Sequence, residues 1–514
     1  GEADSKPGLA DIGIFNALGL TANGMGNHEF DGGIDEFATM LEYANYPFLA
    51  VNLDFSNVQL QDGTPAIEIG VDGGSVVENA GKVAKSAYVE VGGEKIGLIG
   101  RAPAGFFNVI SDPATNHPGL DFVGGRDPET NQPLASAVGQ VLEQVAILEA
   151  QGINKILLLD HEQDFTGDPL STEFLNGIDI IVSAGSTGFM AGDRVEGPFN
   201  LLRPGDSGSA AYPTTRADAD GNPVLVVNSE QLYRYVGNLI VGFDAHGIVD
   251  FVDSRSGPVA TTEDAVTKLR EFTGLLDTFK PVAEVQAIWD SLQGTPLIQR
   301  LFEVVGTTSA PLNGLRADVR SRETNLGRLA ADSTLWFAGR HIAQANIPFD
   351  GVDIALKNGG GIRDTIAGPN VTRLAVSAAL AFDNKLAIVE VTAAELLATM
   401  ENAVSRFPAR DGRFPQLAGV FFEFDPSRPG LSDQRALFTG TRVGTLVVTR
   451  ADGSEDAVVE NFQLLGDPHR TFVLATNNFL LTGGDGYRAL KGVNDDPDRP
   501  AYITDLGEQD ILSD

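Results

Sequence analysis

Short apolar runs alternate with amphipathic stretches through the first half of the chain, a pattern typical of alternating strands and helices. Strands are predicted at residues 48–53, 95–100, 155–159, 178–182, 224–227 and 239–243. A helix predicted at 138–149 comes just before the strand that leads into Asp160-His161. Because ligands bind at the carboxyl ends of strands in open α/β sheets, we expect residues 1–255 to form one layered domain with polar groups at that edge.

The pattern becomes helical between Thr261 and about Val305. Two apolar stripes at helical spacing, one ending before Pro281 and one before Gly294-Thr295-Pro296, predict two helices. Trp289 lies in the second stripe, where an aromatic residue is far more often core than ligand-binding. We interpret residues 256–305 as a helical linker.

A second α/β unit begins at about residue 306. Helices are predicted at 323–340 and 393–407, and strands at 352–356, 386–391 and 471–475. The two units share no sequence pattern, and 514 residues exceed what one hydrophobic core supports. We therefore predict two different domains, the second covering residues 306–514.

The charge of the chain limits its partners. With 36 basic and 70 acidic residues the formal charge is −34, which argues against a nucleic acid polymer, although a small phosphate ester needs only a few local cations. Cysteine is absent, so metal ligands must come from His, Asp, Glu and Asn. No apolar run approaches the roughly 18 to 20 residues of a membrane span. The chain starts at Gly1 without a visible signal peptide, and we expect a fragment or processed form of an exported protein.

Two glycine-rich stretches carry the candidate chemistry. Gly26-Asn27-His28-Glu29-Phe30-Asp31-Gly32-Gly33 puts an imidazole beside an amide and carboxylates. It predicts a metal or phosphate loop, with a tight turn around a hydrogen-bonded histidine as the alternative. Asn358-Gly359-Gly360-Gly361-Ile362-Arg363 follows a strand and combines exposed backbone N–H groups with a guanidinium. That combination suits a phosphate or carboxylate, and a plain turn is the alternative.

The order of these blocks resembles a known family. Glu323-Thr324-Asn325-Leu326-Gly327, the glycine-rich loop, Asn477-Asn478-Phe479-Leu480 and Gly483-Gly484-Asp485-Gly486-Tyr487 together resemble the C-terminal domain of the 5′-nucleotidase family, over residues 306–492. The Gly26–Gly33 stretch is similar to a metallophosphatase block. The resemblance implies an N-terminal calcineurin-like metallophosphatase domain of four α/β/β/α layers, N-terminally incomplete, and a C-terminal 5′-nucleotidase α/β domain.

The resemblance also implies a nucleotide site in the second domain. Phosphate would be bound by Arg340 at the end of the helix after the Glu-Thr-Asn block, and by Asn358, Gly360 and Arg363 of the loop. Phe382 and Phe479 would clamp the base, and Asp485 would meet the sugar hydroxyls. Arg413 matches a third family arginine.

The metal blocks depart from the family. Asn27 and His161 match metal ligands, His28 matches the histidine that stabilises the transition state, and Glu29 stands beside it as a second catalytic candidate. Aligned through the strand at 179–182, Gly185 and Thr187 replace two histidine ligands, and two upstream blocks are absent from this sequence. One or two divalent ions are expected, with Ca²⁺, Mg²⁺, Mn²⁺ and Zn²⁺ all open. A site rebuilt from Ser186, Asp193 and Asp206 is an alternative, whereas Asp218-Ala219-Asp220-Gly221-Asn222 is interpreted as an acidic turn.

Three functions follow. The first is an exported phosphohydrolase, extracellular or periplasmic, that cleaves nucleoside monophosphates or related phosphate esters with metal-activated water, helped by domain rotation as the resemblance implies. The second is a catalytically degenerate nucleotide-binding protein. The third is an extracellular structural or surface protein that keeps only the fold.

Overall fold

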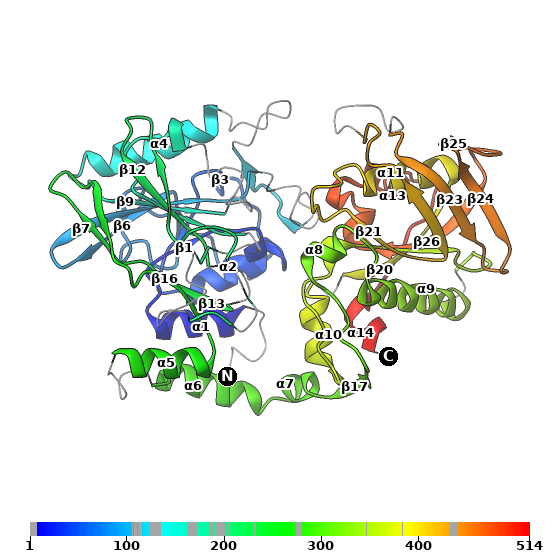
Figure 1. Ribbon diagram of the computed structural model, residues 1–514, viewed down its shortest axis with the longest axis horizontal. Coiled ribbons are helices and arrows are strands. Elements are labelled where there is room, and N and C mark those ends of the chain that lie inside the picture. The colour runs from blue at the N-terminus through cyan, green and yellow to red at the C-terminus, as the bar shows by residue number, and fades with distance from the viewer. Residues whose placement is uncertain are drawn as a thin grey trace. The chain divides into compact units, whose positions relative to one another are not determined.

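The computed structural model describes residues 8–104, 106, 110, 116–123, 135–161, 172–185, 190–191, 201–203, 206, 208–229, 233–273, 280–345, 347–382, 384–431 and 440–513. Two compact units divide the chain, Gly1–Leu292 and Gln293–Asp514 (Figure 1). The boundary between the units falls within the predicted linker. The helix α5 (Glu263–Thr273) lies before the boundary, α6 (Ala283–Gln293) ends at it, and α7 (Pro296–Leu301) lies after it. None of the helices in these ranges combines the length and apolar character that crossing a membrane requires.

The first unit is built on a seven-stranded sheet in the order β11-β12-β10-β9-β7-β6-β4. Its central strands β12, β10, β9 and β7 are parallel. The strands are β4 (Gly74–Ser75), β6 (Ser86–Val91), β7 (Glu94–Arg101), β9 (Ile156–Asp160), β10 (Ile180–Ser183), β11 (Thr214–Ala217) and β12 (Pro223–Val227). The predicted strands at 95–100, 155–159, 178–182 and 224–227 are therefore found within a residue or two.

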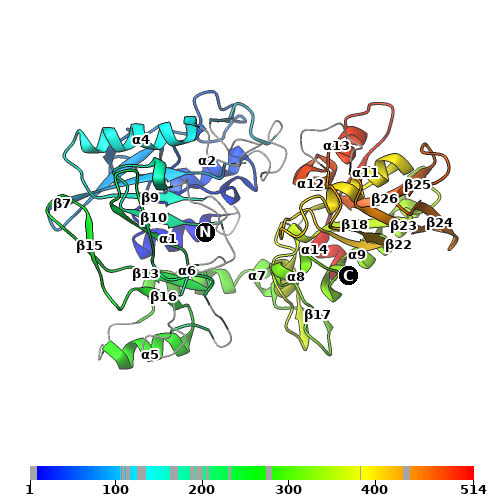
Figure 2. The same ribbon diagram turned by 45° about the horizontal axis from the view of Figure 1, so that its top comes forward.

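Two different layers cover this sheet. On one face, α4 (Ala135–Glu149) buries Val141, Val145 and Leu148 against β9, β10 and β12. On the other lies a three-stranded sheet of β1 (Asn23–Gly24), β2 (Phe48–Leu49) and β5 (Val83–Ala84), itself covered by α1 (Leu9–Leu18) and α2 (Ile34–Tyr43) (Figures 1 and 2). The predicted four-layer α/β/β/α arrangement is confirmed.

The two sheets approach so closely that a side chain at the contact would not fit. A Cβ atom on Gly100 would lie 2.0 Å from the carbonyl oxygen of Leu49, and one on Gly24 would lie 2.6 Å from Cβ of Leu159. Glycine at these two positions therefore lets β1 and β2 lie against β7 and β9.

The remaining strands of the first unit pair in short antiparallel ladders. They are β3 (Leu53–Asp54) with β8 (Asp121–Phe122), β13 (Tyr235–Asn238) with β16 (Gly257–Ala260), and β14 (Val241–Phe243) with β15 (Val249–Val252). The last pair matches the predicted strand at 239–243.

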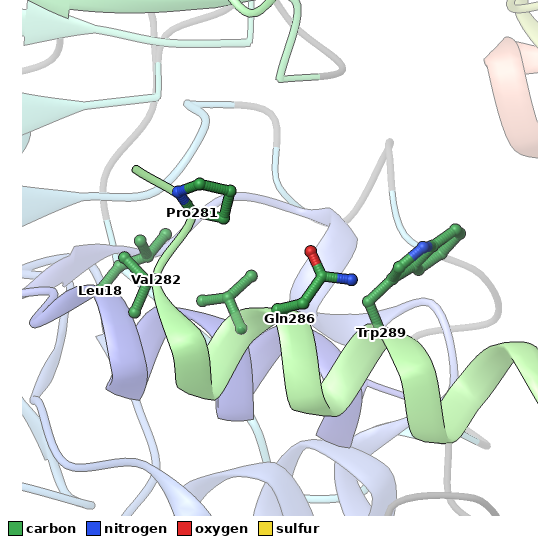
Figure 3. A pocket seen from close by; sticks show the side chains of 6 residues that line it. Leu18, Pro281, Val282, Gln286 and Trp289 are labelled. Atoms are coloured by element: carbon green, nitrogen blue, oxygen red, sulfur yellow. The ribbon is translucent and has the colours of Figure 1, made fainter. Parts of the chain in front are cut away.

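An apolar groove lies between α1 and α6. It is lined by Leu18, Pro281, Val282, Val285, Gln286 and Trp289 (Figure 3). The predicted core role of Trp289 is wrong, because its side chain is 42% exposed and no residue of α6 is buried. The apolar stripe still makes a contact, because Ile288 of α6 lies against Gly13 of α1.

The second unit has a five-stranded sheet in the order β21-β18-β26-β20-β27 and a four-stranded antiparallel sheet in the order β22-β23-β24-β25. The strands are β18 (Ile354–Asn358), β20 (Lys385–Thr392), β21 (Pro415–Ala418), β22 (Val420–Phe424), β23 (Val443–Thr449), β24 (Glu455–Glu460), β25 (Gln463–Leu464), β26 (Thr471–Asn477) and β27 (Tyr502–Gly507). β17 (Val304–Thr307) and β19 (Asn370–Thr372) form a separate pair.

Helices cover both faces of the five-stranded sheet. On one face, α9 (Asn325–Ala345) and α14 (Glu508–Ser513) pack against β18, β20 and β26. On the other, α11 (Ala393–Ala403), α12 (Asn478–Leu481) and α13 (Arg488–Asn494) share a core with the four-stranded sheet. Thr392 and Glu395 form a capping box that starts α11 at its predicted position.

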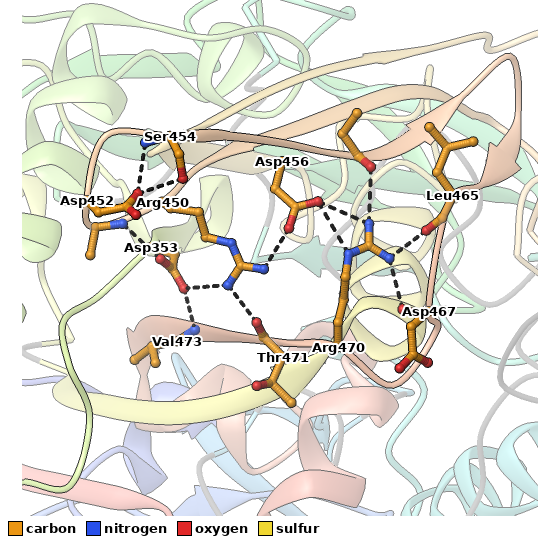
Figure 4. Close-up of polar contacts among 12 residues, drawn as sticks. Asp353, Arg450, Asp452, Ser454, Asp456, Leu465, Asp467, Arg470, Thr471 and Val473 are labelled. Atoms are coloured by element: carbon orange, nitrogen blue, oxygen red, sulfur yellow. Dashed lines mark hydrogen bonds and ion pairs between the residues drawn. The ribbon is translucent and has the colours of Figure 1, made fainter.

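Ion pairs join the β23–β24 hairpin to the larger sheet. Asp456 accepts from Arg450 at 2.6 Å and from Arg470 at 3.2 Å, while Arg450 also donates to the carbonyl of Thr471 at 2.7 Å. Asp353 accepts from the backbone N–H of Val473 at 2.9 Å (Figure 4). This network fixes the two sheets of the second unit relative to each other.

Asp179, just before β10, carries a pH-dependent part of the stability of the first unit. Burial raises the pKa of Asp179 to about 7, with repulsion from Asp218 and Asp244 adding to the rise, and a hydrogen bond from Ile156 and the charge of Lys155 opposing it. The folded chain thus binds this proton more tightly than the unfolded chain does. The free energy of unfolding must fall as pH rises from about 4 to about 7.

We expect Asp179→Asn to raise the melting temperature relative to the unmodified chain at pH 8 but not at pH 4, because the amide cannot ionise and its oxygen can still accept from Ile156. Thermal unfolding followed by circular dichroism at both pH values measures this difference. Asp250→Asn, at an exposed position of β15, is the control. An equal shift at both pH values for Asp179→Asn would contradict the assignment.

Candidate functional site

Three neighbouring parallel strands of the first unit end in buried polar residues. The register places Arg101 of β7 and Ser183 of β10 on either side of Asp160 of β9. Arg101 donates to Asp160 through Nε at 2.8 Å and through an Nη at 3.1 Å, and both residues are almost completely buried. The Asp160 carboxylate is thus neutralised by a guanidinium, which accounts for an acidic residue next to His161.

The loop of Asn27 and the strand end of His161 come together at Gly26. A Cβ atom on Gly26 would lie 2.5 Å from Cε1 and 2.7 Å from Nδ1 of His161, so the imidazole lies directly against this glycine. Asn27, the next residue, is buried. The two predicted metal ligands, separated by more than a hundred residues, therefore belong to one place in the fold.

Glu29 and His28 have different surroundings in this loop. Both oxygens of Glu29 accept hydrogen bonds, from Asn23 at 2.8 Å and from the backbone N–H of Gly26 at 3.0 Å. Glu29 thus holds the loop between Asn23 and Gly26 in shape. His28 begins the short helix η2 (His28–Phe30), is exposed, and its Nδ1 lies 2.9 Å from Oδ2 of Asp31.

The donors fit part of one metal site. Asn27 and His161 offer an amide oxygen and an imidazole nitrogen, both suited to a divalent ion. Within the described ranges, no group of three or more His, Asp or Glu side chains is placed to hold a metal. The roughly six to eight ligands of a two-metal site are therefore not assembled by these residues.

The structure describes only some of the residues proposed as alternative metal ligands. Asp206 accepts from the hydroxyl of Tyr235 at 2.6 Å and from Arg234 at 3.0 Å, so it is committed elsewhere. Ser186, Thr187 and Asp193 lie outside the described residues, whereas Gly185 follows β10 in a left-handed conformation. The acidic turn is as predicted: Asp218 accepts from the N–H groups of Asp220 and Asn222 at 2.9 and 2.7 Å.

In the second unit, β18 runs into the short helix η5 (Gly359–Gly361). The predicted exposure of the glycine N–H groups is wrong for two of them: Gly359 donates to the carbonyl of Phe414 at 2.7 Å and Gly360 to that of Gly412 at 2.8 Å. A Cβ on Gly359 would meet the carbonyl oxygen of Val319 at 2.2 Å. The glycines serve close packing between neighbouring segments.

Asn358 and Asp485 form the centre of this region. Nδ2 of Asn358 donates to Oδ2 of Asp485 at 2.6 Å, and Nδ2 of Asn477 lies 3.4 Å from Oδ1 of Asn358. Burial raises the pKa of Asp485, and repulsion from Asp411 adds to it, while Asn358, Arg320 and Arg413 oppose the rise. Asp485 lies in η6 (Gly484–Gly486) with a φ of 52°, a left-handed conformation imposed on a non-glycine residue.

The two predicted base-binding rings are both half-buried. Phe382 lies 5.4 Å from the guanidinium of Arg363, measured to the ring centroid. Phe479 covers Gly484, where a Cβ would approach the ring to 2.5 Å, and so lies beside Asp485. Each ring is therefore next to another predicted site residue.

Arg340 is separated from this group. It lies on an exposed part of α9, 4.6 Å from the ring of Trp336. The start of α9 packs near the loop through Gly327 and Gln416, but Arg340 is roughly 20 Å farther along the helix. Its neighbour Gly339 faces Val352, which precedes β18, whereas Asn358 ends that strand. The predicted phosphate contact of Arg340 is corrected: it lies at the opposite end of the strand.

Arg320 is the arginine that the sequence reasoning missed. It follows α8 (Arg316–Val319), is 8% exposed, and its Nε has no hydrogen-bond partner within the described residues. Burial lowers the pKa of Arg320 to about 9, and so do Arg316 and Arg363, while Asp485 and Asp411 raise it. Three arginines (Arg316, Arg320 and Arg363), here called the arginine cluster, thus lie in one small region, where Arg316 and Arg363 both repel Arg320.

Such an arrangement is suited to an anion. Burial and two like charges outweigh the attraction of Asp485 and Asp411 for the Arg320 guanidinium, so a further negative group would stabilise it. Arg316 and Arg320 are four residues apart just before the Glu-Thr-Asn block, a spacing of one helical turn that could have revealed them. Arg413 is engaged instead with Asp411 at 2.9 Å and with Ser405 at 3.0 Å.

Comparison with known proteins agrees with this geometry. A family model described as "5'-nucleotidase, C-terminal domain" matches residues 304–492. A 5'-nucleotidase from Diplobatis ommata is 27% identical over 505 residues, covering 97% of this chain and 73% of the relative. A snake venom 5'-nucleotidase from Crotalus adamanteus is 26% identical over 492 residues, covering 94% of this chain and 70% of the relative.

A solved structure extends the likeness to the fold of each domain. The 5'-nucleotidase precursor from Thermus thermophilus matches with a TM-score of 0.74 and 27% identity, covering 99% of this chain and 83% of that one. The blocks around Asn358 and Asp485, the four-layer first unit and these matches lead to one conclusion: residues 304–492 match the C-terminal domain of 5′-nucleotidases, and the chain is similar to 5′-nucleotidases over most of its length.

Proposed function

We propose that this chain hydrolyses phosphate monoesters of nucleotides, with nucleoside monophosphates as the substrate class. The arginine cluster beside Asn358 and Asp485 carries the proposal, because a buried guanidinium nitrogen without a partner among the described residues calls for an anion. The half-buried rings of Phe382 and Phe479 add stacking surface for a base. The 5'-nucleotidases to which the chain is similar make a nucleotide the natural ligand of these groups.

Each group has a distinct task in binding. Arg320 and Arg363 would hold the phosphate by charge-assisted hydrogen bonds, which are stronger than neutral ones. Asp485 would accept from a sugar hydroxyl, and Asn358, hydrogen-bonded to it at 2.6 Å, would hold the carboxylate in place. The aromatic rings contribute stacking, which tolerates different bases.

The first unit would supply the bond-breaking groups. Asn27 and His161 would hold a divalent ion, which when bound supplies activated water and charge stabilisation. His28 would support the negative charge that develops on the leaving oxygen, and Asp31, 2.9 Å from its Nδ1, would hold the imidazole ring in orientation. Glu29 would keep the loop in shape. Export to an extracellular or periplasmic space belongs to this proposal.

A second function has two observations in its favour. The described residues assemble no three-ligand acidic or histidine cluster, and Asp160 is neutralised by Arg101. A catalytically degenerate protein that binds nucleotides through the second unit would show these features too. Hydrolysis and binding must therefore be measured separately.

Phosphate release from AMP tests the proposed reaction. We expect release by the purified chain, its loss in EDTA, and its return when a divalent ion is added back. Calorimetric titration in EDTA should show that AMP still binds, because the arginine cluster needs no metal. Binding without release under any added ion would support the degenerate protein, and the absence of both would refute both functions.

Replacement of Arg320 tests the phosphate site. We expect Arg320→Met to weaken AMP binding in EDTA about 10- to 100-fold, the loss of a charge-assisted hydrogen bond to a buried anion. Arg340→Met is a matched control, since it removes an exposed arginine of the same unit, and its affinity should stay within about twofold. Equal affinities for Arg320→Met and the unmodified chain would disprove the assignment.

Gly26→Ala tests the placement of His161. The added Cβ would lie 2.5 Å from the imidazole, so His161 must move. We expect kcat to fall on the order of 10- to 100-fold, with AMP affinity in EDTA unchanged. Gly139→Ala is the control, because a Cβ there meets nothing within 4 Å. Normal turnover by Gly26→Ala would separate His161 from catalysis.

A further inference from the structure

The first two residues of α14, Glu508 and Gln509, form hydrogen bonds with the turn that contains Phe382. The turn lies between α10 (Arg373–Ala379) and β20 and includes Leu380, Phe382 and Asn384. The backbone N–H of Glu508 donates to the carbonyl of Asn384 at 3.0 Å, and Nδ2 of Asn384 donates to Oε1 of Glu508 at 3.1 Å. Gln509 donates to the carbonyl of Leu380 at 3.0 Å. Both ends of the turn are thus held by the same helix.

Glu508 also reaches the strand of Asn358. Its Oε2 forms a buried ion pair with Lys357 of β18, in which the side chains are 3% and 5% exposed. Because successive side chains of a strand point to opposite faces, Lys357 faces α14 while Asn358 faces Asp485. One carboxylate therefore connects the strand of Asn358 to the turn of Phe382.

A third contact ties this turn to the arginine of the loop. The backbone N–H of Arg363 donates to the carbonyl of Ala379 at 2.8 Å, just before the turn. The guanidinium of Arg363 lies 5.4 Å from the ring of Phe382. A shift of the turn would therefore change the position of the ring relative to Arg363 and Asn358 together.

Stability alone does not account for the ion pair. Removing two charges from water is costly, and a well-packed apolar pair of similar volume is often at least as stable. A buried ion pair does, however, fix the relative position of the elements that it joins. Lys357 and Glu508, separated by 151 positions in sequence, join elements that both contribute to the nucleotide site.

We propose that Glu508 is a positioning residue of the nucleoside site, which holds Phe382 at stacking distance from a base bound beside Asn358 and Arg363. The inference rests on the proposed function, because it requires a nucleotide at this site. Glu508 acts through Lys357 and Asn384 and makes no contact with the substrate itself.

Calorimetric titration of the full chain in EDTA, with AMP and separately with inorganic phosphate, tests this role. In Lys357→Met/Glu508→Met we expect an unchanged or higher melting temperature, AMP affinity about tenfold weaker, and phosphate affinity within about twofold. The arginine cluster, which binds phosphate, is left intact by the double change. A purely structural pair would instead move both affinities with the melting temperature, or neither, and that result would overturn the proposal.

Gln509→Leu provides a second, milder variant. It removes the hydrogen bonds of Gln509 to the carbonyl of Leu380 and from the hydroxyl of Ser377 in α10, but keeps the ion pair. It should lower AMP affinity while leaving phosphate affinity unchanged, and it decides the question alone if the double variant does not fold. Lys491→Met, which removes an exposed ion pair with Asp495, is the control.

Phe382→Ala separates failure of this proposal from failure of the proposed function. If Phe382→Ala weakens AMP binding but the Glu508 and Gln509 variants bind like the unmodified chain, the positioning role is refuted and the nucleotide site stands. If the unmodified chain binds no AMP, both are refuted.

Discussion

Close approach of the backbone at a few glycines is the constraint on which both units depend. In the first unit, Gly100 and Gly24 let two sheets meet, and Gly26 lets the imidazole of His161 reach the Asn27 loop. In the second unit, Gly359 packs on Val319. At each of these positions a methyl group would overlap a neighbouring atom, so the functional groups can converge only where side chains are missing.

Buried charge is handled in three different ways within this framework. Arg101 and Asp160 neutralise each other at the edge of the first sheet, and Lys357 and Glu508 do so behind the loop of Asn358. Arg320 is different, because its buried Nε has no partner among the described residues and two more arginines lie nearby. The first two arrangements fix geometry, whereas the third is suited to an anion. This difference separates residues that shape the site from those that would bind the ligand.

The proposed nucleotide site is therefore more fully formed by the described residues than the proposed hydrolytic site. Around Asn358, a hydrogen-bonded carboxylate, half-buried rings and guanidinium groups lie within one unit. Around Asn27, one imidazole and one amide meet at a glycine, beside His28 and its carboxylate partner Asp31. Phosphate ester hydrolysis requires both sites, and nucleotide binding requires only the second unit.

The sequence by itself determined the local structure and the resemblance to 5′-nucleotidases. The spacing of apolar residues and the positions of glycines predicted the central strands, α4, α9 and the loop at Asn358, because these elements depend on residues close together in the sequence. Only the tertiary structure decided which charges meet: Arg101 pairs with Asp160 across 59 positions, and Arg320, in place of Arg340, acts on the charge of Asp485. The tertiary structure also leaves Trp289 exposed, on a helix that has no buried residue. Strand register and helix packing set these outcomes, and neither is encoded in the spacing of residues along one segment.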